Sequence, residues 1–264
     1  MSLSLWLAAP LIGLVLSLFA AGGGMIAIPL LSFGVGMPLK QAVATSLIIV
    51  AAVSLIALLQ NKRWKLIEWR LHRFFARGGM LGGFLGASIG LHISSELQTI
   101  LFVGLMLFVA WWMHSERMEN MIAHAKTTPC DCRYSFLAGI VTGLVTGLLG
   151  IGGGFLIVPL LLMLGVENYQ SAVAHSLMLI ASSSLVAALR YANNLDIAWQ
   201  PTMLIVVLAA VGIWVGHWVS TRYSPVHLQK AFSVMLVCMA GWMLFRTFGA
   251  SEIPLNPNFS TGRL

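Results

Sequence analysis

Charged residues are scarce in this chain: they make up 9% of its 264 residues, while hydrophobic residues make up 59%. Soluble domains carry about 25% charged residues, so the composition excludes a soluble globular fold. Several apolar runs approach the roughly 20 residues that a helix needs to cross a bilayer. The first run, Leu3 to Ala20, has no Lys or Arg before it, so we expect it to be retained rather than removed as a signal peptide. The composition therefore predicts a helical membrane protein with several spans.

Acidic residues are missing from every apolar run. All eight lie in loops, in a polar linker or in the C-terminal tail: Glu68, Glu96, Glu116, Glu119, Asp131, Glu167, Asp196 and Glu252. A cation channel or a proton pump that relies on membrane carboxylates is therefore disfavoured. An enzyme is disfavoured as well, because the sequence has no His-Glu-x-x-His motif and no buried pair of acids. The adjacent His175 and Ser176 point to different sides of a helix, so they cannot form a nucleophile–base pair.

Cysteine is rare too, with three in the chain, and these do not form a disulfide framework. Cys130 and Cys132 share a polar linker with His124, where they form either a weak metal site or, as the commoner case, reduced thiols without function. Cys238 lies in an apolar run. We expect neither a metal nor a cofactor.

Glycine, in contrast, is abundant and occurs as two triplets in apolar surroundings. FAAGGGMIAIPLL occupies residues 19–31, and LLGIGGGFLIVPLL occupies residues 148–161. The first glycines (152 − 22) and the prolines (159 − 29) of the two runs are both 130 residues apart, and AVATSL at 42–47 matches AVAHSL at 172–177 at the same offset. A register held without gaps over about a hundred residues indicates a duplication, as in many transporters.

Each half of the chain holds one glycine-broken run followed by three plain apolar spans. In the first half, 1–113, these are Trp6 to Phe33 and then about Ala42–Leu59, Phe74–Leu91 and Leu97–Met113. In the second half, 134–248, they are Tyr134 to Leu164 and then about Ala172–Leu189, Met203–Val219 and Leu228–Phe245. A polar linker, 114–133, joins the halves, and a C-terminal tail, 249–264, follows them.

Lysine and arginine set the expected orientation, because they gather in cytoplasmic loops. The loop after the first plain span holds six of them against a single glutamate, whereas its counterpart in the second half has Arg190 and Asp196 alone. The two halves are therefore predicted to point in opposite directions across the membrane, with the linker in the cytoplasm. The net charge of +7 arises from such flanking residues, and no basic face remains to bind nucleic acid.

This orientation constrains the glycine-broken runs. With three plain spans in each half, each broken run must begin and end on one side of the membrane. It would then be a re-entrant hairpin of two short helices, turning at Gly22–Gly24 and at Gly152–Gly154. If the broken runs cross once instead, the halves would be parallel unless the linker also crosses.

The glycine turns are the expected substrate site. A backbone turn inside a membrane is tolerated where it is buried in protein or lines a cavity. A new helix starts directly after each triplet, and its first amides are unpaired and carry the positive end of the helix dipole, which binds anions. Close helix packing is the alternative, and it explains spaced glycines such as Gly82, Gly86 and Gly90 better than adjacent ones. The expected site comprises Gly22, Gly23, Gly24, Gly152, Gly153 and Gly154.

Four side chains early in the first plain span of each half extend this site. Thr45-Ser46 and His175-Ser176 occupy equivalent positions at the 130-residue offset. Hydroxyls and a neutral imidazole can donate to the oxygens of an anion without placing a permanent charge in lipid. Equally, Ser and Thr can bond back to their own helix. His175 titrates near neutral pH and is the candidate for carrying a coupled proton, while Arg190 would attract anions through its field.

The doubled Gly-Gly-Gly-x4-Pro-Leu-Leu, each copy followed by Ala-Val-Ala-x-Ser-Leu, resembles the TauE/SafE sulfite exporter family of membrane permeases. The resemblance covers about residues 10–247. It implies a permease of the bacterial or archaeal inner membrane for sulfur-containing anions, including sulfite, sulfonates and sulfoacetate. The halves differ where family copies often agree, since Thr45 stands opposite His175 and Lys40 opposite Gln170. Any site is thus asymmetric.

Together these features predict an all-α, multi-pass permease of two inverted repeats, each a re-entrant hairpin plus three transmembrane helices. Its predicted partners are a small anionic substrate and the lipid bilayer. Two alternatives stay open: an uncoupled anion channel with the same site, and a non-transporting membrane scaffold. Concentrative or pH-dependent flux would exclude the channel, and any anion flux would exclude the scaffold.

Overall fold

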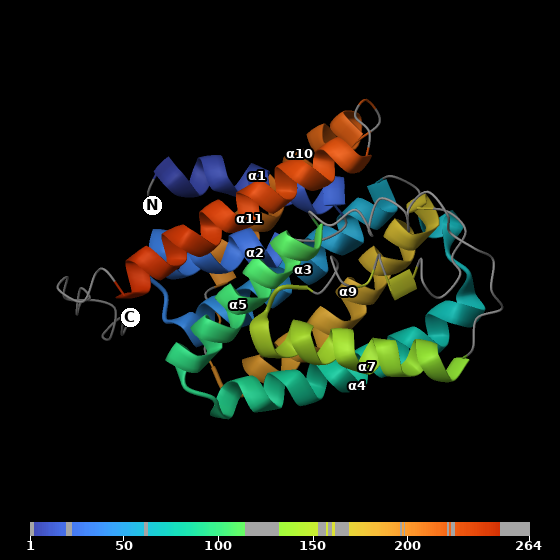
Figure 1. The fold of residues 1–264 in the computed structure, drawn as a ribbon, viewed down its shortest axis with the longest axis horizontal. Helices are drawn as coiled ribbons and strands as arrows, with labels where there is room; N and C mark the ends of the chain where they lie inside the picture. Colours follow the sequence, from blue (N-terminus) through green and yellow to red (C-terminus); the bar gives the residue numbers. More distant parts are fainter. Residues whose placement is uncertain are drawn as a thin grey trace.

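The computed structural model describes residues 3–19, 23–60, 63–113, 132–152, 157, 160–161, 169–195, 197, 199–220, 222 and 225–248. These residues are helical almost throughout, with no strand among them. The helices lie packed along one another (Figure 1). In chain order the elements are α1 (Leu3–Phe19), α2 (Gly23–Pro29), the π-helix η1 (Leu30–Gly34), α3 (Leu39–Gln60), the 3-10 helix η2 (Arg63–Leu66), α4 (Trp69–His92), α5 (Ser95–Met113), α7 (Cys132–Leu149), α9 (Tyr169–Ala192), α10 (Trp199–Ser220) and α11 (Pro225–Phe248).

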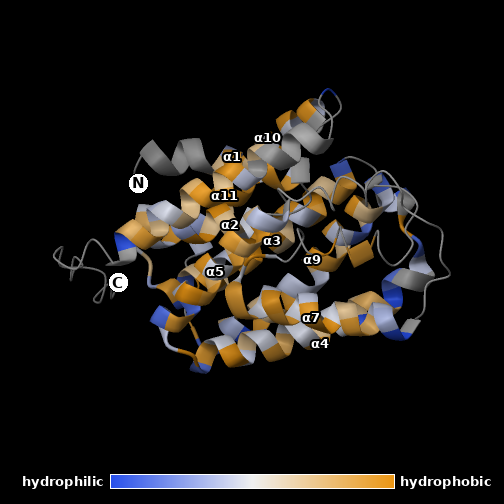
Figure 2. Ribbon diagram, in the orientation of Figure 1, coloured by the Kyte–Doolittle hydropathy of each residue, from blue (hydrophilic) through white to orange (hydrophobic). Residues whose placement is uncertain are grey.

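Five of the described helices, α3, α4, α5, α9 and α10, are long and apolar enough to cross a membrane. They coincide with five of the six plain spans expected from the sequence. The sixth span lies within α11, whose apolar stretch Ser233–Arg246 is shorter. Apolar residues run along most of the helices (Figure 2), and large ones such as Trp111 and Phe245 are each 72% exposed. A surface of this kind suits contact with lipid rather than water.

The two halves fold into matching helices. Three pairs of matching helices begin 130 residues apart: Leu39 and Tyr169, Trp69 and Trp199, Ser95 and Pro225. The offset equals that of the sequence repeat, so the duplication extends to the starts of these helices.

Contacts between the halves are reciprocal. α1 packs along α10 and α7 along α4, while the matching helices α3 and α9, and α5 and α11, contact each other (Figure 1). Glycines allow two of these contacts: Gly82 lies against the backbone of Ile140, and the equivalent Gly212 lies against that of Pro10. A helix of the first half thus contacts a helix of the second half, and the equivalents of these two helices contact each other in the same way. Such reciprocal contacts are what a twofold rotation between the two halves produces. The interpretation of the spaced glycines as packing positions is confirmed.

Helix α3 runs in the opposite direction to its equivalent α9. Lys40 Nζ, at the start of α3, donates to the carbonyl of Leu91 near the end of α4 (2.7 Å), so α3 and α4 are antiparallel. Near the ends of α9 and α4, Arg190 Nε donates to Ser88 Oγ (3.0 Å), and their starts are also in contact, so these two helices are parallel. It follows that α3 and α9 are antiparallel.

The first glycine-broken run forms two helical legs. α2 and η1 both contact α1, so the second leg lies back against the first. The turn was expected at Gly22–Gly24, but Gly23 and Gly24 belong to the first turn of α2. Gly22 lies outside the described residues.

The second broken run leaves the helical conformation earlier than expected. α7 ends at Leu149, and Gly150 and Gly152 have φ angles of +72° and +82°. Side chains rarely adopt this left-handed conformation, so glycine is required at both positions. Gly153 and Gly154 lie outside the described residues, and the expected turn is therefore seen from Gly150 to Gly152.

Candidate functional site

The two glycine breaks meet each other inside the protein. A side chain at Gly24 would collide with the backbone of Gly150 and Ile151. Ser46 Oγ, from α3, lies 3.1 Å from the carbonyl oxygen of Gly150 and 2.8 Å from that of Val43, so its one proton serves these two acceptors. All five residues are buried. Segments from both halves of the chain thus converge on one contact.

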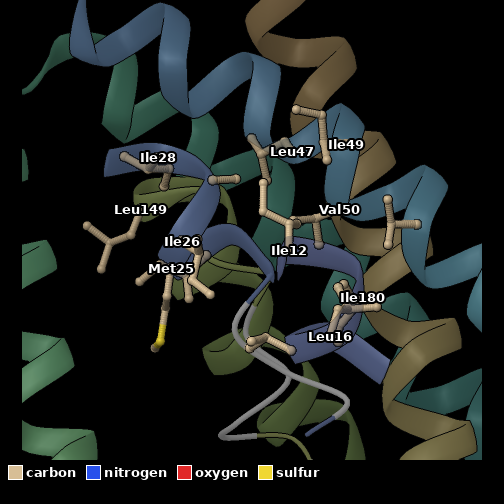
Figure 3. Close-up of a cluster of buried hydrophobic side chains, with 14 of the residues drawn as sticks. Ile12, Leu16, Met25, Ile26, Ile28, Leu47, Ile49, Val50, Leu149 and Ile180 are labelled. Atoms are coloured by element: carbon tan, nitrogen blue, oxygen red, sulfur yellow. The ribbon is translucent and has the colours of Figure 1, made fainter. Parts of the chain in front are cut away.

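The surroundings of this contact are apolar. Met25 and Ile28 of α2, Leu47 of α3 and Leu149 of α7 are at most 4% exposed and belong to one cluster of buried apolar side chains (Figure 3). A side chain added at Gly150 would meet Ile28 of this cluster and Val43 of α3. Water is therefore kept from the first turn of α2. Hydrogen bonds and dipoles act more strongly in such a region of low dielectric. The first turn of α2 is packed against Leu16 of α1 at Gly23 and against the backbone of Gly150 and Ile151 at Gly24.

The hydroxyl groups of the predicted site are used in different ways. Ser176 Oγ donates to the carbonyl of Val173 (2.9 Å), the same bond to its own helix that Ser46 makes. These hydroxyl protons are engaged, so the bond back to the helix, left open by the sequence, applies to both serines. Thr45 Oγ1 is buried and has no hydrogen-bond partner. Among the predicted hydroxyls, that of Thr45 remains free to donate to a ligand.

His175 is tied to the start of α4. The backbone N–H of Glu68 donates to His175 Nε2 at 3.0 Å. Because Nε2 accepts this bond, the neutral ring carries its hydrogen on Nδ1. That Nδ1 atom is buried and has no partner, and the whole side chain is 1% exposed. A buried donor without a partner is costly, which makes His175 a candidate functional group.

His72 was missed by sequence reasoning. Its ring centroid lies 5.9 Å from that of His175, with a 34° angle between the rings, and its Nδ1 is also buried without a partner. The sequence placed this residue in a basic cytoplasmic loop, because the apolar span was expected to begin at Phe74. α4 begins at Trp69 instead, and its first turns bury His72 against α9. The sequence did contain one signal for this residue, because His72 is the histidine of a segment that is otherwise rich in Lys and Arg.

The predicted side chains lie at two levels rather than in one cluster. Val50 and Ile180, equivalent residues of α3 and α9, both lie against Gly152, which marks the crossing of the two helices. Ser46 and Ser176 precede these residues by four positions each, about 6 Å along a helix. Because the helices are antiparallel, the two serines lie on opposite sides of the crossing. His175, next to Ser176, is thus separated from the Ser46 contact.

A second group of polar side chains lies at the other end of α4 and α9. Arg190, bonded to Ser88, also lies over the ring of Phe84, 5.7 Å from its centroid. Gln98 Nε2 donates to the carbonyl of Leu148 at the end of α7 (2.6 Å). Arg190 is half-buried in this group. It lies near the end of α9, whereas His175 lies near the start of the same helix.

The described residues contain no group of three or more His, Cys, Asp or Glu side chains that could hold a metal ion. Cys130, Cys132 and His124, considered as a weak metal site, lie outside the described residues. Glu68 and Glu96, the two acidic residues that the structure describes, are both exposed at helix starts.

Comparison with known proteins gives one consistent result. A family model described as sulfite exporter TauE/SafE matches residues 5–243. The chain is 33% identical over 245 residues to a probable membrane transporter protein of Xylella fastidiosa, covering 91% of this chain and 94% of that protein. It is 28% identical over 253 residues to a probable membrane transporter protein of Methanocaldococcus jannaschii, covering 89% and 92%. No solved structure matches the chain significantly.

Proposed function

The chain belongs to the sulfite exporter TauE/SafE family of membrane transporters, and we propose that it is a permease for small sulfur-containing anions of the sulfite, sulfonate or sulfoacetate class. The observation that carries this proposal is the buried meeting of the two glycine breaks, Gly24 against Gly150 and Ile151. Backbone amides at the start of a helix are suited to anions, and the two acidic side chains among the described residues, Glu68 and Glu96, are exposed rather than buried at this contact.

The architecture we propose is a pair of inverted repeats. The antiparallel course of α3 and α9 and the exchanged contacts of α1 with α10 and α4 with α7 support a twofold axis across the helices. In a membrane that axis lies in the plane of the bilayer, as in other transporters with inverted repeats. The broken runs would be re-entrant hairpins. The basic segment 62–77 and the linker 114–133 would face the cytoplasm, with the protein in the inner membrane.

The substrate site we propose is built mainly from the main chain. The amides of Gly22, Gly23 and Gly24, and of Gly152, Gly153 and Gly154 by the repeat, would bind the anion, and Thr45 Oγ1 would donate to it. Ser46 and Ser176 border the site, and Ser46 fixes the carbonyl of Gly150. His175, on the far side of the helix crossing, would carry a coupled proton rather than share the glycine site.

Flux measurements on the purified protein in liposomes test the proposal. Labelled sulfite, and then a sulfonate, are offered with and without an imposed pH gradient. Saturating flux that rises with the gradient supports a coupled permease. Flux that neither saturates nor responds to pH would favour an anion channel, and no flux for any sulfur anion would overturn the substrate class. Empty liposomes prepared in the same way give the background.

A further inference from the structure

We infer that His72 and His175 act as one proton-binding pair, and that a proton arriving at His175 releases the start of α4 from α9. The proton coupling rests on the proposed function, whereas the pair itself rests on contacts between three elements. His72 comes from α4, His175 from α9, and the backbone amide of Glu68 from the connection between α3 and α4. A proton needs no cavity, so the close packing of the two rings does not argue against such a site.

The hydrogen bond from Glu68 decides where a proton can bind. Nδ1 of neutral His175 already carries its hydrogen, and Nε2 holds the lone pair that accepts the Glu68 N–H. A proton that binds His175 takes this lone pair. The Glu68 N–H then faces an N–H group instead of an acceptor, and the bond between α9 and the start of α4 is lost. A proton bound at His175, unlike one bound at His72, thus breaks the hydrogen bond between α9 and the residue that precedes α4.

The two rings can hold one proton but hardly two. Two cationic rings with centroids 5.9 Å apart would repel strongly in a buried, low-dielectric environment. Each ring also offers a buried Nδ1 without a partner. Both side chains are buried, His72 at 5% and His175 at 1% exposure, so a second charge on the rings would not be screened by water.

No other titratable side chain among the described residues competes for this proton. The described side chains in the first turns of α9 and the last turns of α3 include no titratable group besides His175. The charged side chains described at this end of η2, α4 and α7 are all exposed: Lys65, Glu68, Arg73, Arg77 and Arg133. The four basic residues among these add positive charge around the rings. A second proton on the pair would be repelled both by them and by the first proton.

Trp69 offers a measurement of this pair that does not depend on transport. Its ring meets that of His72 edge to face, with centroids 6.1 Å apart, and it is 55% exposed. A protonated imidazole quenches nearby indole fluorescence. The emission of Trp69 is obtained as the difference between the wild type and Trp69→Phe, and it is followed between about pH 8 and pH 4. We expect it to fall on acidification.

Three variants separate the pair from independent histidines. His72→Gln should abolish the fall in Trp69 emission, while His175→Gln should keep it but shift its pH midpoint, because the neighbouring charge site is gone. His92→Gln is the matched control and should leave the response unchanged, since His92 bonds to Ser88 in its own helix and is exposed. A midpoint that stays the same in His175→Gln would overturn the pair, and so would a pH-independent wild type.

Amide exchange and flux complete the test. The Glu68 amide should exchange faster at acid pH in the wild type than in His175→Gln, whose side-chain oxygen can accept the bond but cannot titrate. In liposomes that show sulfite flux, both glutamine variants should lose the acceleration by a pH gradient, and His92→Gln should retain it. A glutamine variant that keeps this acceleration would refute the coupling. Liposomes without any sulfite flux would refute the proposed substrate instead, while fluorescence and exchange still decide the pair.

Discussion

The two halves of the molecule carry different chemistry at equivalent positions. His72 and His175 face each other in the contact of α4 with α9, and their counterparts 130 residues away are Thr202 and Thr45. All four side chains are at most 5% exposed. An imidazole can bind a proton and become charged, whereas a hydroxyl stays neutral, so a proton can change the charge on the two histidines but not on the two threonines. The helices of the two halves are arranged nearly symmetrically, but the side chains that could bind a proton at these equivalent positions occur on one side alone.

This asymmetry fits the needs of a coupled transporter. A twofold fold provides two equivalent ways to reach a central site, one from each side of the membrane. If both sides carried the same titratable groups, protons would act on both in the same way. In the proposed permease, imidazoles on one side alone would let a proton gradient bias one of the two openings. The two halves can therefore be tested both at positions where they are alike and at positions where they differ.

The largest effect is expected at the contact that both halves share. In Gly24→Ala the new methyl group would collide with the backbone of Gly150 and Ile151, which cannot rotate away. We expect a loss of about 1–3 kcal/mol in stability from overpacking, together with loss of flux. Thermal unfolding in detergent and sulfite flux in liposomes measure the two effects.

Gly104→Ala is the matched control for that variant. Gly104 lies in α5 with nothing within 4 Å of an added methyl group, so its substitution should leave unfolding and flux unchanged. If Gly24→Ala behaves like Gly104→Ala, the two glycine breaks do not depend on their close contact. The main-chain site would then have to be abandoned.

The next largest effect is expected at a position where the two halves carry different residues. His175→Ala removes the acceptor of the Glu68 N–H, which should cost about 1–3 kcal/mol, and it should sharply reduce flux while folded protein is still recovered. Thr45→Ala, at the equivalent position, removes a hydroxyl without a partner and should hardly change the unfolding temperature. Unaltered flux in His175→Ala would remove this histidine from the mechanism, and equal destabilisation by both variants would contradict the asymmetry.

Much of the architecture could be predicted from the sequence, because the length of apolar runs and the spacing of a repeat can be recognised in the sequence itself. Apolar length indicated the crossing helices, and the constant offset between Gly22 and Gly152 indicated the duplication. The positions of the turns were less well predicted. Gly23 and Gly24 were assigned to a turn, but they serve in a helix that packs against the other half.

The site was harder to predict than the fold, for two physical reasons. Side chains from distant parts of the sequence are brought together in the site, as with His72 and His175, and no spacing rule predicts such a contact. Hydroxyl groups are also ambiguous in sequence, because a serine within a helix can bond to its own carbonyls as well as to a ligand. Ser46 does the first and also contacts Gly150 in the other half.

Ser46→Ala should have a moderate effect. Its hydroxyl connects α3 of the first half with the glycine break of the second, so its loss leaves the carbonyl of Gly150 without that donor, at a cost of about 0.5–1.5 kcal/mol. Ser182→Ala is the matched control, since Ser182 Oγ donates to Leu179 in its own helix. Unfolding of the two variants is compared under the same detergent conditions. An equal change in both would show that the contact between the halves adds nothing.

The smallest effect is expected where one half has a cation and the other an amide. Lys40→Gln makes this position the same as Gln170 and removes a positive charge from the last turn of α4, where Lys40 Nζ meets the carbonyl of Leu91. Positive charge at the end of a helix is worth about 0.3–1 kcal/mol, and salt screens it. We therefore expect a slightly lower unfolding temperature that approaches the wild-type value at high salt, and no such change in the exposed control Lys65→Gln. A salt-independent loss would mean that Lys40 acts through packing of its long side chain rather than through its charge.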